Sequence, residues 1–217
     1  MKTLFLSMFF LTLCAACAPG TQDLPVTSDT DFRIVSTVSP ITSIVENIGG
    51  SKVTLHGLIP EGTNSHTYEP SPSTVALLVD ADLIIANGLF LEIPTLKLAE
   101  ANKKDDTIIL RLGNEVITEE EWTWDESFPE SGGHPNPHLW TDPTMGIRYA
   151  QVVAKQLSTL DPDNSHYYEK NLETFSDRLT DLDARIKVAV NTIPPEGRKL
   201  LTYHDSFPTF APRYGFE

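Results

Sequence analysis

Three of the six histidines stand at points where a predicted strand or loop leads into a predicted helix. His66 lies in NSHTYEPSPS, His138 lies in NPHLWTDP, and His204 ends KLLTYH. Three imidazoles suit zinc, and also iron or manganese if oxygen atoms complete the ligand set. Because the three are far apart in the sequence and form no local motif such as HExxH, their residue types alone favour an ordinary structural role.

The other three histidines have weaker claims to a metal. His56 lies inside a strand pattern, and His166 lies at the start of a long helix, so we expect both to be structural or solvated. His134 lies in an acidic loop and could touch a metal loosely. None of these three is therefore grouped with His66, His138 and His204 as a leading metal-ligand candidate.

Three neighbours of the leading histidines have predicted supporting roles. Glu69 could accept the second ring N–H of His66. Asp142 precedes Pro143 and is expected to cap a helix rather than bind a metal. Trp140 is expected to pack.

The composition is acidic, with 30 Asp and Glu against 16 Lys and Arg and a net charge of −14. Nucleic acids require a basic surface, so this balance argues against a nucleic-acid partner. It is compatible with a cation as ligand, although a solubilising surface charge accounts for most of it. Charge excludes one class of partner without selecting another.

The N-terminus has the pattern of a secretory signal. Lys2 precedes an apolar run over residues 4–13, which is too short to span a bilayer. Two alanines directly before Cys17 resemble a bacterial lipoprotein box, although Cys14 stands where leucine is usual. We expect a signal peptide over residues 1–17 and a lipid on Cys17, with ordinary cleavage nearby as the alternative. Either outcome gives an exported chain, anchored to the cell membrane or free in the periplasm.

Both cysteines lie in this N-terminal segment. The exported chain is therefore expected to have no disulfide and to depend on its hydrophobic core. Any metal site must then be built from His, Asp, Glu and water.

Strands and helices alternate from Phe32 to residue 160, after a polar tether over residues 18–31. This alternation predicts an α/β fold, with a parallel sheet, helices on both faces and ligands beyond the carboxyl ends of the strands. The predicted strands lie within 33–40, 52–60, 83–86 and 107–112; the predicted helices lie at 41–50, from Ser71-Pro72 with Val75, Leu78 and Val79 on the apolar face, and at 94–102.

Residues 114–137 interrupt this pattern with an acidic segment that is long for a loop. After it, a helix is predicted from Asp142-Pro143. The connecting region 161–193 holds a long amphipathic helix, predicted over Asn164–Val190, because apolar residues recur at spacings of three and four.

Residues 194–217 are expected to begin a second α/β lobe. Lys199–Tyr203 has a strand pattern, and Ser206–Tyr214 has a helix pattern. One strand and one helix cannot bury both faces of a sheet, so we expect this lobe to be incomplete at Glu217.

Five segments together carry a resemblance to a known family. They are IVSTVSPITSIVENIGG, PEGTNSHTYEPSPS, HPNPHLWTDP, DNSHYYEKNLETFSDRLTDLDARI and LLTYHDSFPTFAPRYG. In this order they resemble the zinc- and manganese-type metal-binding lipoproteins of bacterial ABC importers, from about Phe32 to the end of the chain. The resemblance implies two lobes joined by one rigid helix, a divalent metal as cargo, a membrane permease as partner, a monomer and no enzymatic activity.

The resemblance also implies the metal ligands, which are His66, His138 and His204. Histidine at the third position is typical of zinc binders and glutamate of manganese binders, so zinc is favoured and manganese comes next. The family's fourth ligand is an acidic residue that would follow Glu217. Water, Asp205 or Glu69 could fill that position. Zinc importers often have a histidine-rich stretch where this chain has His134 alone, which weighs a little against zinc.

Two alternatives to the binding protein stay open. The same three histidines could hold a catalytic zinc in a hydrolase, with Glu69 or Asp205 as base. The chain could also be a truncated product with impaired metal binding. The lipoprotein pattern, the acidic composition and the absence of a catalytic motif favour the binding protein. Some family members are described as adhesins, but these residues do not indicate whether this chain is one of them.

Overall fold

The computed structural model describes residues 32–217, so the expected signal peptide, the tether and Cys17 lie outside it. Four short parallel strands form one sheet in the order β2–β1–β3–β4. The strands are β1 (Arg33–Ser36), β2 (Thr54–Gly57), β3 (Leu83–Ala86) and β4 (Ile108–Arg111). All four residues of the inner strand β3 are buried, as its continuous apolar sequence requires. The predicted parallel α/β fold is confirmed.

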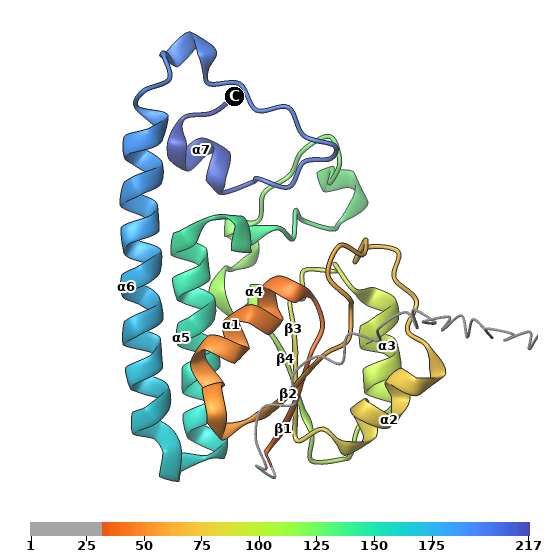
Figure 1. Cartoon of the computed structure of the whole chain (residues 1–217). Helices are drawn as coiled ribbons and strands as arrows, with labels where there is room; N and C mark the ends of the chain where they lie inside the picture. The colour runs from red at the N-terminus through yellow and green to blue at the C-terminus, as the bar shows by residue number, and fades with distance from the viewer. Residues whose placement is uncertain (1–31) are drawn as a thin grey trace, which may run out of the picture.

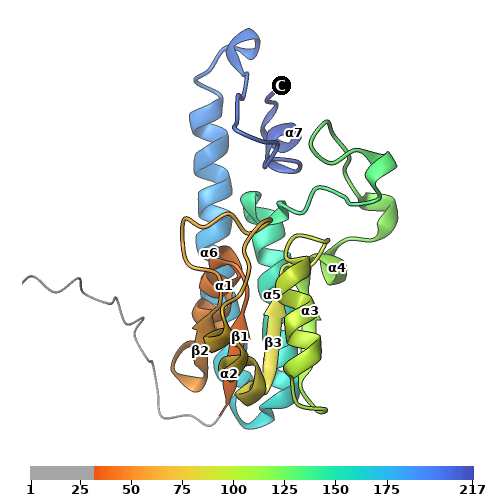
Figure 2. The same ribbon diagram turned by 90° about the vertical axis from the view of Figure 1, so that its right-hand side faces the viewer.

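Helices cover both faces of this sheet (Figures 1 and 2). On one face lie α2 (Pro72–Asp80) and α3 (Ile93–Asn102), on the other lie α1 (Ser39–Gly49) and α5 (Pro143–Leu160), and the short α4 (Leu112–Val116) follows β4. The loops that leave the carboxyl ends of the strands therefore gather at one edge of the sheet.

Two predicted helix starts differ in how they are capped. Asp142 caps α5 as predicted, because its carboxylate accepts a hydrogen bond from the backbone N–H of Thr144 at 2.8 Å. Ser71 occupies the cap position of α2, but its hydroxyl lies 2.7 Å from the Ser73 hydroxyl and makes no capping bond. Proline at the first position of each helix pre-sets the backbone in both cases.

The long helix α6 (Ser165–Val190) has 26 residues and is about 39 Å long. Its first half packs on α1 and α5 through the buried Tyr168 and the half-buried Leu172 and Phe175. Its second half continues past the start of α5 and reaches α7 (Phe210–Tyr214), as Figure 1 shows. None of the helices within residues 32–217 is long and apolar enough to cross a bilayer.

The strand predicted at Lys199–Tyr203 was wrong. Residues 199–203 form no strand, and Leu201 and Tyr203 are fully exposed. A strand is stable only when a neighbour pairs with its backbone. The four strands within residues 32–217 do not include such a neighbour. The following helix is also shorter than the predicted Ser206–Tyr214, since it begins at Phe210.

The predicted apolar face of α2 was partly wrong. Leu78 is fully buried and Val75 is half-buried, but Val79 is 44% exposed. Thr74, one turn before Leu78, takes the buried position instead. The helix therefore presents the row through Thr74 and Leu78 to the core, which turns Val79 toward solvent.

Candidate metal centre

The structure brings His66, His138 and His204 together at the carboxyl edge of the sheet. The Nε2 atom of His138 lies 3.3 Å from Nε2 of His66 and 3.2 Å from Nε2 of His204. One ligand atom from each ring falls within 4.8 Å of the other two. Within the described residues, no second group of three His, Cys, Asp or Glu side chains meets this condition.

Each histidine comes from a different part of the chain. His66 lies on the loop between β2 and α2, and His138 lies directly before a turn of 3-10 helix, Leu139–Thr141, that leads into α5. His204 lies on the irregular segment between α6 and α7. The convergence of three such distant residues is a tertiary feature rather than a local motif.

Asn136 determines which ring nitrogen of His138 faces the cluster. Its Oδ1 lies 2.8 Å from Nδ1 of His138 and also accepts the backbone N–H of His138 at 3.2 Å. Its Nδ2 donates to a carboxylate oxygen of Asp125 at 2.7 Å, which fixes the orientation of the amide. An amide oxygen only accepts, so the neutral His138 ring carries its proton on Nδ1 and directs the Nε2 lone pair at the other two rings.

Asn136 also connects His138 to the segment that carries His204. The same Nδ2 donates to the backbone carbonyl of Asp205 at 3.1 Å. Asn136 is fully buried, so these bonds are shielded from water. The sequence reasoning missed both Asn136 and Asp125. The one available signal was the position of Asn136 two residues before a candidate ligand, in HPNPH.

Burial disfavours the protonated form of two of the imidazoles. His138 is 5% exposed, and burial, together with the nearby His66 and His204, lowers its pKa to about 3. Burial also lowers the pKa of His66, with a smaller effect from His204. Neutral imidazoles are the form that binds metals. His204 keeps part of its surface exposed, so the cluster is open to solvent on that side.

Aromatic rings enclose the buried side of the cluster. The Phe128 ring lies 5.7 Å from His66 and 5.6 Å from His138, and Trp140 meets the His138 ring edge-on at 5.1 Å. A pocket of about 280 Å³ opens beside His66 and Phe128. A larger pocket of about 530 Å³ lies between α3 and the loop after β3, but it contains none of the three histidines.

The weaker candidates lie outside the cluster. His134 is exposed and stacks on Phe90 with ring centres 4.4 Å apart. Glu69 is exposed and, among the described residues, forms no hydrogen bond with His66. Asp205 follows His204, but its carboxylate accepts from the backbone N–H of Phe207 at 3.4 Å. Burial, and then the carboxylate of Asp125, raises the pKa of Asp205.

The two histidines that were expected to be structural or solvated are not part of this cluster. His56 lies on β2 and is half-buried. His166 lies in the first turn of α6 and is exposed. Both serve as internal controls for substitutions at the cluster.

Residues 34–217 match the family described as Zinc-uptake complex component A periplasmic (ZnuA), and the chain belongs to this family. The manganese ABC transporter substrate-binding lipoprotein PsaA of Streptococcus mitis is 36% identical over 98% of this chain and 68% of its own length. The metal ABC transporter substrate-binding lipoprotein SsaB of Streptococcus sanguinis is 36% identical over 97% of this chain and 68% of its own length. The chain thus spans about two thirds of the length of these relatives.

Solved structures share the fold. The periplasmic zinc binding protein TroA from Treponema pallidum superposes with a TM-score of 0.77 at 28% identity, over 85% of this chain and 64% of TroA. The Mn-bound periplasmic metal binding protein from Candidatus Liberibacter asiaticus gives a TM-score of 0.74 at 29% identity, over 85% and 66% of the two chains. The named relatives are substrate-binding proteins rather than enzymes, so the hydrolase alternative is rejected.

The low pKa of His138 predicts a pH dependence of stability. In the unfolded chain this imidazole titrates near its ordinary pKa of 6.5, whereas in the folded chain it titrates at about 3. At this residue the unfolded state therefore binds more protons between these values, so the contribution of His138 to the free energy of unfolding of the metal-free chain falls as the pH falls from 6.5 toward 3. This residue contributes at most about 1.4 kcal/mol per pH unit.

Urea unfolding in the presence of a chelator, at stepwise pH, measures this slope. We expect the slope to be smaller in His138→Asn, because the substituted side chain does not titrate. Equal slopes in the two proteins would contradict the assignment.

The contacts of Asn136 predict a second effect. If His138 binds the metal, Asn136→Ala should lower zinc affinity about ten- to 100-fold, because the imidazole loses the partner that fixes its tautomer and orientation. Calorimetric titration measures the affinity. Asn102→Ala is the matched control, since the Asn102 amide donates to the Leu98 carbonyl within α3 rather than to a residue of the cluster. An unchanged affinity in Asn136→Ala would show that Asn136 has no part in the site.

Proposed function

We propose that this chain is the extracytoplasmic solute-binding component of an ABC importer. It captures a divalent transition metal and delivers that ion to a membrane permease. The observation that carries the proposal is the convergence of one ring nitrogen each from His66, His138 and His204 within 4.8 Å of one another. Membership of a family whose named members include metal-binding lipoproteins of ABC transporters supports it.

We favour zinc as the ion, with manganese next. Three neutral nitrogen donors suit zinc, and nitrogen sites generally bind zinc more tightly than manganese. Manganese prefers a shell richer in oxygen. A water molecule on the solvent-exposed side of His204 would complete a tetrahedral zinc shell. The names of relatives point both ways, to manganese in PsaA and to zinc in TroA.

The location and assembly belong to the same proposal. The chain acts outside the cytoplasmic membrane as a monomer, held there by a lipid on Cys17 or released into the periplasm by ordinary cleavage. The relatives named as lipoproteins support the anchor. Cargo binding requires no nucleophile or general base, so the site needs only ligands and a route to solvent.

Calorimetric titration of the chain with zinc and with manganese tests the function. We expect zinc to bind more tightly than manganese, and His66→Ala and His138→Ala each to lower zinc affinity by at least about 100-fold, because each removes a metal–nitrogen bond. His56→Ala and His166→Ala should leave the affinity unchanged. Tighter binding of manganese would refute the zinc preference alone, whereas indifference to both ligand substitutions would refute the site.

A further inference from the structure

Apart from the bond that Asn136 donates to the Asp205 carbonyl, the segment that carries His204 makes few contacts that hold it in place. Residues 198–209 contain no helix or strand. The Leu200 N–H donates to the Glu217 carbonyl at 2.8 Å, and the Glu217 N–H donates to the Arg198 carbonyl at 2.9 Å, so the segment is tied back onto the end of the chain that follows α7. The position of His204 therefore depends on the attachment of α7 as well as on the Asn136 bond.

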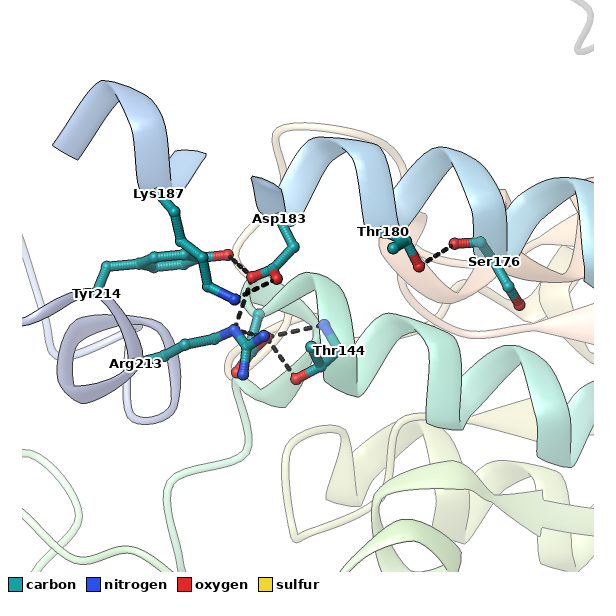
Figure 3. A network of polar contacts seen from close by, with 8 residues as sticks. Thr144, Ser176, Thr180, Asp183, Lys187, Arg213 and Tyr214 are labelled. Atoms are coloured by element: carbon teal, nitrogen blue, oxygen red, sulfur yellow. Dashed lines mark hydrogen bonds and ion pairs between the residues drawn. The ribbon is translucent and has the colours of Figure 1, made fainter. Parts of the chain in front are cut away.

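A carboxylate on the long helix holds α7. Asp183 of α6 accepts from Nε of Arg213 and from the hydroxyl of Tyr214, each at 2.8 Å, and from Nζ of Lys187 at 2.7 Å (Figure 3). Two of these three donors belong to α7. The Asp183 side chain is only 13% exposed, and these donors hold its pKa well below the usual range.

The same guanidinium also faces a second carboxylate, at the start of α5. Nε of Arg213 lies 3.6 Å from Oδ1 of Asp142, which is buried. This oxygen also accepts from the backbone N–H and the hydroxyl of Thr144, each at 2.8 Å, at the start of α5. His138 lies four residues before Asp142. One side chain thus connects the helix that follows His138 with the helix that follows His204.

The low exposure of its two carboxylates separates this network from an ordinary surface ion pair. Exposed pairs contribute little because water screens them. Here the carboxylates of Asp142 and Asp183 have side-chain exposures of 4% and 13%, and the Arg213 side chain is 28% exposed. Charge-assisted hydrogen bonds from a guanidinium to a carboxylate that is shielded from solvent fix geometry as well as adding energy.

We propose that Arg213 is a positioning residue for the metal site. It fastens α7 to α6 and to the start of α5, and so holds His204 at its distance of 3.2 Å from His138. Because coupling is reciprocal, a metal that binds all three imidazoles also strengthens the docking of α7. This inference rests on the proposed metal-binding function.

A double-mutant cycle on zinc affinity, measured by calorimetry on the whole chain, tests the proposal. We expect Arg213→Ala to lower zinc affinity about ten- to 100-fold, as substitutions of residues that orient ligands do. In the His204→Ala background, the same substitution should change the affinity by less than about twofold, since there is no third imidazole left to position. Arg213→Lys, which keeps the charge but loses the planar fork, should fall between Arg213→Ala and the unsubstituted chain.

Lys187→Ala is the matched control. It removes another cation from Asp183 but leaves the α7 contacts in place, so we expect the zinc affinity to stay within about twofold. If Arg213→Ala loses its cooperative thermal unfolding, the cycle is run with Arg213→Lys instead.

Two results would overturn the proposal: unchanged zinc affinity in Arg213→Ala, or an equal loss in both backgrounds. The second would show that Arg213 acts on the whole fold rather than through His204. Failure of the unsubstituted chain to bind zinc or manganese would refute the proposed function itself. Binding that depends on His66 and His138 but not on Arg213 would refute only this inference.

Discussion

The close approach of three imidazole Nε2 atoms is the constraint on which the rest of this structure depends. Protonated rings repel one another, and the single Nε2 lone pair of a neutral His138 can accept a full N–H···N hydrogen bond from only one of its two neighbours. Burial disfavours the protonated form of His138 by lowering its pKa to about 3. The amide oxygen of Asn136 requires the His138 ring proton on Nδ1, so His138 cannot donate a hydrogen bond from Nε2 to either neighbour. A cation shared by the three lone pairs relieves this arrangement.

The fold provides two kinds of support for this cluster. The parallel sheet and its helices hold His66 and His138 on loops at the carboxyl edge of one compact lobe (Figure 1). His204 has no such lobe beneath it among the described residues, and it reaches the site through contacts made by Asn136, Arg213 and Tyr214. The long helix α6 is the common support, since it packs on the sheet lobe at one end and carries Asp183 toward the other.

Local patterns predicted the features that local physics determines. The 3.6-residue periodicity predicted the long helix within one residue of its observed start, and the apolar run of β3 predicted a buried strand. Strand ends also indicated where His66 and His138 would gather, although the family resemblance was needed to join them to His204. Features that depend on distant partners were missed. Lys199–Tyr203 has the composition of a strand but no neighbour to pair with, and Asn136 acts only through Asp125, His138 and Asp205.

X-ray absorption spectroscopy of the zinc-loaded chain tests the central claim most directly. The account predicts that three imidazole nitrogens surround the zinc at about 2.0–2.1 Å, with one further oxygen or nitrogen atom. His204→Ala should reduce the imidazole count from three to two. A spectrum of the unsubstituted chain that required only one imidazole, with oxygen atoms filling the shell, would contradict a site built from His66, His138 and His204.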